Sequence, residues 1–149
     1  MSAAPVLVIA VGLPGSGKST YLANLGVQAI STDAIRLLLA DDATDQSVHR
    51  AVFATVRFLI RQRVAIGRPV TYVDATSLTR KDRKFFLKIA KLYGCRAEAL
   101  FFDTPLDVCL QRNRNRARVV PEDVIRTMAG KLAPPATTEG FAAVTVVAP

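Results

Sequence analysis

The chain has 149 residues, of which 50% are hydrophobic and 21% are charged, and this balance excludes disordered and collagen-like proteins. Its length fits a single domain, residues 1–149, that can bury a core without disulfides or metal ions. The 20 lysines and arginines against 12 acidic residues give a formal net charge of +8, which favours phosphate-bearing partners.

Two features of the composition predict a cytoplasmic protein that does not contact membranes. The longest apolar run, residues 3–11, is too short to span a bilayer, and no basic residues precede it as in a signal peptide. Cys95 and Cys109 lack the spacing of a zinc site, so we expect them to fill the core of a reduced protein.

The predicted elements alternate between strands and helices. Residues 6–11 form a continuous apolar run ended by Gly12, as in a strand that is buried on both faces of a parallel sheet. In chain order, we expect strands at 6–11, 29–31, 70–73, 97–102 and 143–147, and helices at 18–25, 32–39, 46–66, 79–93, from 105 into the arginine-rich stretch, and 121–132. This order predicts an α/β fold with helices on both faces of a parallel sheet and a site at the carboxyl ends of the strands.

The strongest motif is GLPGSGKS at residues 12–19, which fits the P-loop pattern G-x-x-x-x-G-K-[ST] at every specified position. It lies between a predicted strand and a predicted helix, the context that this motif requires. Backbone N–H groups of such a loop surround a phosphate, Lys18 reaches the β- and γ-phosphates, and Ser19 supplies a Mg²⁺ ligand. The expected ATP-binding residues are Gly12, Gly15, Ser16, Gly17, Lys18, Ser19 and Thr20.

A second constellation is STDAIR, residues 31–36, at the start of the next predicted helix. Asp33 and Arg36 are three residues apart and share a helix face. Near a γ-phosphate, Asp33 could deprotonate an acceptor hydroxyl, and Arg36 could hold an anion of the acceptor. The alternative is an acidic residue in the first helical turn that the helix dipole stabilises, with a surface arginine beside it.

Asp74 ends the predicted strand VTYVD, at the edge of the sheet where ligands bind. It could bind a water of Mg²⁺ or hold Arg36 in position. The alternative is a structural role in a turn with Thr76 and Ser77.

The stretch 111–118, QRNRNRAR, contains four arginines and no acidic residue. Arg112 and Arg116 are four residues apart on one expected helical face, so both could reach the γ-phosphate from a lid at about residues 112–120. Arg114 and Arg118 are expected to point elsewhere. The alternative is a solvated basic surface or a nucleic-acid-binding arm.

A second basic cluster lies on the predicted helix 79–93, where Asp82 is the acidic partner. It could follow a polyanionic acceptor, or it could be a solvated face with no function. Its members are Arg80, Lys81, Arg83, Lys84, Lys88 and Lys91.

From residue 6 to about 141, the sequence resembles the kinase module of polynucleotide 5′-kinases of the phage kinase-phosphatase and bacterial RNA-repair types. These belong to the wider zeta-toxin-like and AAA_33 P-loop kinases. The resemblance rests on GLPGSGKST, STDAIR, the DDATDQ loop, VDAT before a basic helix, FFDTPLDVCLQRNRNR, VVPEDVIRTM and a closing EGF.

The resemblance implies that Lys18 and Ser19 bind phosphates and Mg²⁺, and that Asp33 activates a 5′-hydroxyl while Arg36 engages a phosphate of the acceptor strand. It further implies that Asp74 supports the acceptor site and that Arg112 and Arg116 clamp the transferring phosphate. Members of the family usually carry a phosphatase, ligase or other end-healing domain. Since this sequence has no D-x-D-x-T phosphatase motif, either the kinase works alone or a separate protein supplies that activity.

The sequence therefore predicts an ATP- and Mg²⁺-dependent kinase of the 5′-hydroxyl ends of RNA or DNA. A small-molecule or nucleotide-sugar kinase is the alternative enzyme, because the same P-loop and D-x-x-R layout serves compact phosphorylated acceptors. A nucleotide-dependent nucleic-acid-binding module is the non-enzymatic alternative, but such a module has no need for the Asp33 carboxylate beside the P-loop.

Overall fold

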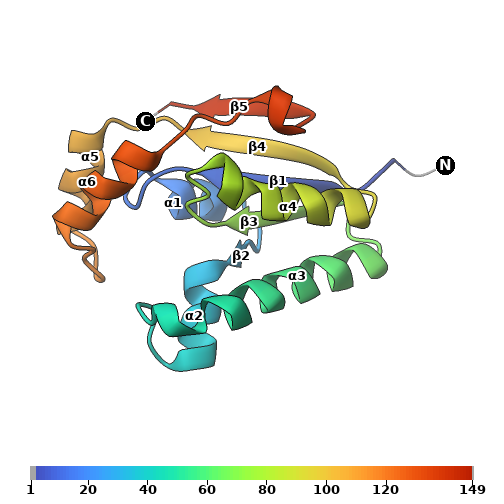
Figure 1. Ribbon diagram of the computed structural model, residues 1–149, viewed down its shortest axis with the longest axis horizontal. Coiled ribbons are helices and arrows are strands. Elements are labelled where there is room, and N and C mark those ends of the chain that lie inside the picture. Colours follow the sequence, from blue (N-terminus) through green and yellow to red (C-terminus); the bar gives the residue numbers. More distant parts are fainter. Residues whose placement is uncertain (1–2, 149) are drawn as a thin grey trace.

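The computed structural model describes residues 3–148 and contains a five-stranded, fully parallel sheet in the order β2-β3-β1-β4-β5 (Figure 1). Strand β1 lies in the centre, and its Leu7, Ile9 and Val11 side chains are completely buried. The strands are β1 (Val6–Val11), β2 (Ile30–Ser31), β3 (Val70–Asp74), β4 (Arg96–Phe102) and β5 (Ala143–Val147). The parallel sheet expected from the sequence is confirmed.

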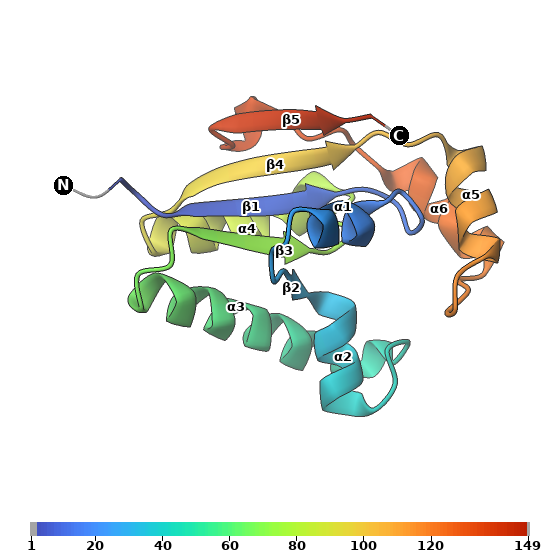
Figure 2. The same cartoon turned by 180° about the vertical axis from the view of Figure 1, so that it is seen from behind.

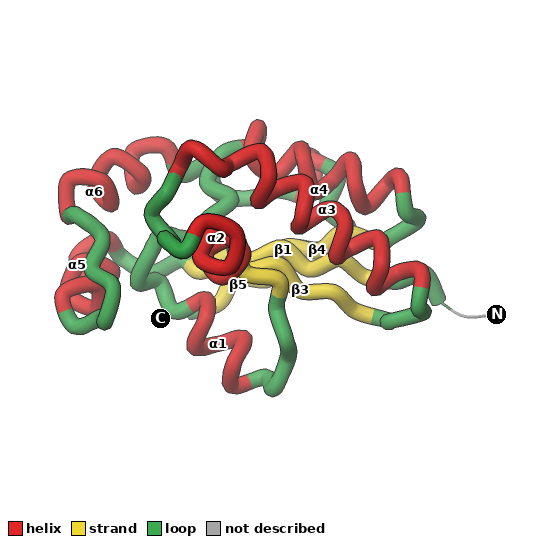
Figure 3. The backbone as a smooth tube through the Cα atoms, turned by 90° about the horizontal axis from the view of Figure 1, so that it is seen from below, coloured by secondary structure: helices red, strands yellow, loops and turns green. Residues whose placement is uncertain are grey.

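Helices cover both faces of this sheet, as expected. Figure 3 shows α1 on one face and α3 and α4 on the other, and Figure 2 shows α5 and α6 beyond the carboxyl ends of the strands. The helices are α1 (Lys18–Asn24), α2 (Thr32–Ala40), α3 (His49–Ala65), α4 (Arg80–Leu92), α5 (Leu106–Arg114) and α6 (Glu122–Lys131), with 3₁₀ turns η1 (Gln46–Val48) and η2 (Thr137–Glu139). Among residues 3–148, no helix has both the length and the apolar character needed to cross a membrane.

The core explains the apolar spacing of α3 and α4. Val52, Val56 and Ile60 of α3 are completely buried, and Phe86 and Ile89 of α4 belong to the same core cluster as the residues of β1. These positions recur every three or four residues, the spacing that places side chains on one face of a helix. The core therefore fixes α3 and α4 side by side on one face of the sheet.

The lid region differs from the sequence-based expectation. Helix α5 ends at Arg114, so Arg116 lies beyond it, and the expected common helical face of Arg112 and Arg116 is wrong. The cause is the completely buried Asn113, whose Nδ2 donates to the Val120 carbonyl at 2.6 Å and whose Oδ1 accepts from the Val120 N–H at 2.9 Å. These two hydrogen bonds close residues 114–120 into a compact turn.

Arg83 also differs from its expected place in a solvated basic face. Its side chain is completely buried and donates to both carboxylate oxygens of Glu139, at 2.9 and 3.0 Å, and to the carbonyls of Ser77 and Leu78. Burial alone would raise the pKa of Glu139, but hydrogen bonds from Arg83 and from the Ala136 N–H hold the pKa below its ordinary value. Arg83 therefore has a structural role: it connects η2 to the loop after β3.

We expect Arg83→Met and Glu139→Met each to destabilise the fold by about 3–5 kcal/mol, because each leaves one charge buried without its partner. The double variant should lose less than the sum of the two, since the partners interact. Urea unfolding of the four proteins measures these free energies. Strictly additive losses would mean that the pair contributes no mutual stabilisation.

Candidate functional site

The loop between β1 and α1 has the backbone conformation of a phosphate-binding loop. Gly15 and Gly17 have φ values of 81° and 98°, which are unfavourable for residues with a side chain. A Cβ atom on Gly15 would also lie 2.6 Å from the Cys109 carbonyl oxygen. The glycines are thus required both for the turn and for its close approach to α5.

The loop fits the phosphates of a nucleotide. The Ser16 hydroxyl is buried and has no hydrogen-bond partner within residues 3–148. The Ser16 carbonyl accepts a hydrogen bond from Thr104 Oγ1 at 2.9 Å, and this bond ties the loop to the segment before α5. Backbone N–H groups of such a left-handed turn form a concavity that suits an anion.

Lys18 lies inside this loop. Its Nζ donates to the carbonyls of Gly12 at 2.8 Å and Leu13 at 2.9 Å. Burial lowers the pKa of Lys18 from 10.5 to about 8; the carboxylates of Asp74 and Asp33 oppose this shift, and Arg116 adds to it. The ammonium group is still mainly charged at pH 7. Within residues 3–148 its hydrogen-bond partners are backbone oxygens alone, which phosphate oxygens can replace.

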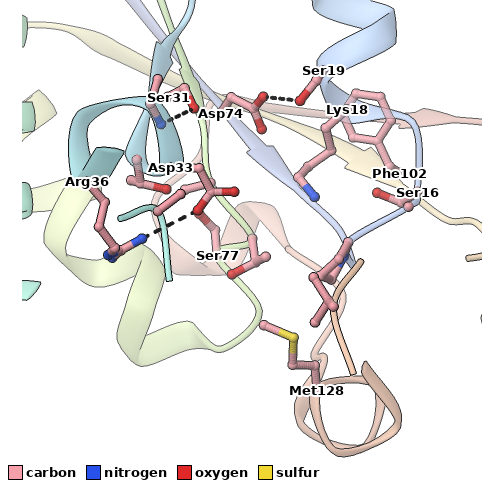
Figure 4. A pocket seen from close by; sticks show the side chains of 18 of the residues that line it. Ser16, Lys18, Ser19, Ser31, Asp33, Arg36, Asp74, Ser77, Phe102 and Met128 are labelled. Carbon is pink, nitrogen blue, oxygen red and sulfur yellow. Dashed lines mark hydrogen bonds and ion pairs between the residues drawn. The ribbon is translucent and has the colours of Figure 1, made fainter. Parts of the chain in front are cut away.

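Ser19 and Asp74 form a pair that suits Mg²⁺. Ser19 Oγ donates to Asp74 Oδ2 at 2.6 Å (Figure 4), and so Asp74 lies on the phosphate side of the site rather than against Arg36. No group of three or more His, Cys, Asp or Glu side chains forms a metal cluster in the described part of the chain. Mg²⁺ commonly uses only one or two protein ligands together with waters and phosphate oxygens, which this hydroxyl and carboxylate fit.

Asp33 and Arg36 lie at the start of α2, where the Ser31 side chain caps the helix by accepting from the Ala34 N–H. Arg36 Nη1 lies 3.4 Å from Asp33 Oδ1, and only 6% of the Arg36 side chain is exposed, against 54% for Asp33. The Arg36 Nε has no partner within residues 3–148. Arg36 is thus a buried guanidinium in the pocket with unused donors.

Arg118 does not point away from the site, contrary to expectation. Its Nη2 donates to Asp33 Oδ2 at 2.8 Å and its Nη1 donates to the Ala43 carbonyl at 3.3 Å. The turn at 114–120 thus brings Arg118 into contact with the Asp33 carboxylate of α2. The sequence contained no pattern that links positions 33 and 118.

Two of the other lid arginines line the pocket and the third lies on the surface. Arg112 and Arg116 line the pocket, and the Arg112 guanidinium lies beside Gly17. Arg114 instead forms an exposed ion pair with Glu122 at 2.6 Å. The structure therefore brings Arg112 and Arg116 to the phosphate loop, although it does so with a helix end and a turn rather than with one helix.

Ser77 is a pocket residue whose sequence context predicts only a turn. It has a φ of 50°, its side chain is buried, and its hydroxyl has no partner within residues 3–148. Its carbonyl is held by Arg83. Thr20 is exposed and also lines the pocket, together with Lys18, Ser19, Asp33, Arg36, Asp74 and Arg118.

Comparisons with known proteins find relatives that match most of this chain. A model of the AAA_33 family, described as an AAA domain, matches residues 7–135. An L-seryl-tRNA(Sec) kinase from Methanococcus maripaludis is 24% identical over 139 residues, which cover 89% of this chain and 54% of that protein. The chain thus spans about half the length of this curated relative.

Solved structures show the same fold at low sequence identity. A gluconokinase from Sinorhizobium meliloti 1021 aligns with a TM-score of 0.65 and 20% identity, over 99% of this chain and 84% of that chain. A chain of the Pnkp1/Rnl/Hen1 complex aligns with a TM-score of 0.59 and 23% identity, over 81% of this chain and 42% of that chain. The fold is that of the P-loop kinases.

Proposed function

The chain belongs to the AAA_33 family of AAA domains, and from this premise we propose that it is an ATP- and Mg²⁺-dependent kinase of 5′-hydroxyl ends of RNA or DNA. The observation that carries the proposal is the pair formed by Asp33 and Arg36 in the pocket of the phosphate loop. An exposed carboxylate can accept the proton of a hydroxyl, and a buried guanidinium beside it can hold a phosphate of the same acceptor.

The donor half of the site consists of the loop, Lys18, Ser19 and Asp74. Bound Mg²⁺ would supply positive charge that neutralises the charge developing on the phosphates during transfer. Ser19 and Asp74 would hold the ion, and Lys18 would exchange its two backbone carbonyls for phosphate oxygens. These residues position the triphosphate for in-line transfer.

The acceptor half depends on Arg36. Arg36 is 5% exposed, and its Nε has no partner within residues 3–148. A buried donor without a hydrogen bond is costly unless a ligand oxygen accepts from it. Its planar donor set matches two oxygens of a phosphate group. A phosphate 3′ to the reacting hydroxyl would supply this anion, while Asp33 orients and deprotonates the hydroxyl.

The acceptor class can be tested directly with labelled ATP. We would compare 5′-hydroxyl oligonucleotides, nucleoside 3′-monophosphates, nucleosides and free sugars at equal concentrations. The expected order of kcat/KM is oligonucleotide above 3′-monophosphate, with the nucleoside far below both. Efficient phosphorylation of a sugar with no transfer to any oligonucleotide would overturn the proposal.

A kinase of a small phosphorylated molecule is the second candidate. Arg36 is a single anion-binding group, so a compact acceptor with one phosphate would satisfy it equally well. The likeness in fold to a gluconokinase fits either candidate, because it extends over the fold alone. The acceptor comparison above separates the two candidates.

A separate end-healing protein is part of the proposal for the biological role. The similar chain of the Pnkp1/Rnl/Hen1 complex is assembled with other proteins, which fits a kinase that works with separate partners. For this chain the partner we propose is a phosphatase or ligase of nucleic-acid repair. Co-expression followed by joining of broken RNA ends with and without the kinase would test this role.

We expect Arg112→Lys and Arg116→Lys to lower kcat strongly, by about 10²-fold or more at saturating ATP. Lysine keeps the charge but loses the planar fork that binds two oxygens of the transferring group. Arg114→Lys is the matched control, because Arg114 pairs with Glu122 on the surface. Similar losses in all three variants would favour a diffuse basic surface over a phosphate clamp.

ATP binding to the free protein should weaken as the pH rises from 7 to 9. Phosphates bind the charged form of Lys18, and with a pKa of about 8 its charged fraction falls about tenfold over this range. The Kd measured by calorimetry at constant ionic strength should therefore rise about tenfold. The Kd of Lys18→Met should change little, and a constant wild-type Kd would contradict the assignment of this titration to Lys18.

A further inference from the structure

The pocket at the phosphate loop continues as a groove along α3 and α4, beyond the reacting groups. Helices α3 and α4 lie against each other there, since the rings of Phe53 and Phe85 meet edge to face with centroids 5.2 Å apart. The part of α3 that lines the groove, residues 49–57, is about 12 Å long at 1.5 Å per residue. Its lining includes His49, Arg50, Phe53 and Arg57 of α3 and Lys81 and Phe85 of α4.

Aromatic rings form one component of this groove. The Phe53 ring lies 4.5 Å from the His49 ring and belongs, with Phe85, to the partly buried residues that pack against the core. Phe86 is buried beside them, 5.2 Å from the Phe85 ring. Core packing thus fixes Phe53 and Phe85 while part of each remains accessible, as a stacking surface for bases requires.

Exposed cations form the other component. Arg50, Arg57 and Lys81 have no carboxylate partner within residues 3–148. The Arg57 Nε donates to the Tyr93 hydroxyl at 3.4 Å. Asp82 also lines this part of the groove, but its side chain accepts from the Thr79 N–H at 3.2 Å in the cap of α4. This part of the groove is therefore positively charged, and aromatic rings lie between the charged side chains.

The remaining basic residues of α4 lie elsewhere. Lys84, Lys88 and Lys91 line a separate depression beside Glu139 and Gly140, away from the phosphate loop. The basic residues of α4 therefore do not share one face: Lys81 lines the pocket, and Lys84, Lys88 and Lys91 line the separate depression. This division supplies a matched set of lysines for a control.

We infer that this groove binds the single-stranded segment of RNA or DNA that follows the reacting 5′-hydroxyl, an inference that rests on the proposed function. Bases stack on Phe53 and Phe85, and backbone phosphates contact Arg50, Arg57 and Lys81. At 3.4 Å per stacked nucleotide, the groove accommodates about three nucleotides. A compact small-molecule acceptor would occupy the Asp33 and Arg36 end and would leave the groove empty.

The test compares two triple variants with equal loss of charge: Arg50→Gln/Arg57→Gln/Lys81→Gln in the groove and Lys84→Gln/Lys88→Gln/Lys91→Gln outside it. Fluorescence anisotropy with labelled five-nucleotide RNA and DNA measures binding. We expect the groove variant to raise Kd about tenfold at low salt and to reduce the salt slope by about 2, since three phosphate contacts are lost. The control variant should change neither, and both should melt at the wild-type temperature.

Phe53→Leu separates stacking from charge, because leucine keeps an apolar contact with the core but presents no ring face. It should weaken oligonucleotide binding about fivefold without changing the salt slope. In kinase assays, neither Phe53→Leu nor the groove triple variant should alter kcat/KM for a nucleoside 3′-monophosphate.

The outcomes distinguish this inference from the proposed function. If oligonucleotides bind but neither triple variant differs from wild type, or both weaken alike, the groove assignment is overturned even if the protein phosphorylates 5′-hydroxyl ends. If binding depends on the groove residues but no oligonucleotide is phosphorylated, the proposed function fails, and the groove remains a binding site for single-stranded RNA or DNA that does not lead to a reacting hydroxyl. Absence of any oligonucleotide binding would overturn the groove assignment.

Discussion

Lys18→Ala is expected to reduce phosphoryl transfer by at least about 10²-fold, the loss typical of removing one preorganised charged donor from a phosphoryl-transfer site. In the described part of the chain, the Lys18 ammonium group is held by only the carbonyls of Gly12 and Leu13, so it is free to move onto phosphate oxygens. Initial rates at saturating acceptor over a range of ATP concentrations would show the loss in kcat/KM.

Folding should not account for this effect. The Lys18 charge is buried at a cost, as its lowered pKa indicates, so alanine should leave thermal stability unchanged or higher. Lys84→Ala, an exposed lysine outside the pocket, is the matched control and should retain wild-type rates. A Lys18→Ala protein with near wild-type transfer would show that this loop does not bind the donor.

The parts of the fold that the sequence predicts are those that local chemistry determines. Short stretches of sequence are enough to predict three features: the apolar run of β1, the glycines of the loop and the capped start of α2. The carboxyl ends of parallel strands then bring distant motifs together, and indeed Ser31 of β2 pairs in register with Asp74 of β3. Asp33, Asp74 and Lys18 could therefore be expected in one pocket.

The parts that the sequence does not predict depend on side chains that meet across long separations. Arg83 and Glu139 are 56 residues apart, and Arg118 and Asp33 are 85 residues apart. Nothing in the local sequence distinguishes Arg83 from the exposed Lys84 beside it except helical phase, which places Arg83 on the same side as Phe86. An arginine in a run of basic residues is ordinarily solvated, so burial against a distant glutamate was not expected.

The end of α5 is a second example. QRNRNR contains good helix formers and no glycine or proline before Pro121, so the pattern predicts a continuing helix. The hydrogen bonds between Asn113 and Val120 end the helix instead, because a side-chain amide can satisfy backbone groups outside a helix. Because the helix ends at Arg114, the following turn brings the Arg118 guanidinium into contact with the Asp33 carboxylate.

Asp33→Asn is expected to lower kcat by roughly 10² to 10⁴-fold while ATP binding is retained, because asparagine keeps the size of the side chain but cannot accept the hydroxyl proton. The carboxylate also pairs with Arg118 at 2.8 Å and Arg36 at 3.4 Å, so the substitution weakens two contacts besides removing the base. A second variant is therefore needed to separate the loss of the base from the loss of these two contacts.

Arg118→Met breaks the shorter contact and leaves the Asp33 carboxylate in place. If Asp33 is the base, Arg118→Met should keep kcat within about tenfold of wild type, and in the double variant the large loss of Asp33→Asn should remain. Single-turnover rates with ATP and a 5′-hydroxyl oligonucleotide measure the chemical step directly. If Arg118→Met alone reproduced the full loss, the ion pair rather than proton transfer would be the function of Asp33; a fully active Asp33→Asn protein would remove the base from the mechanism.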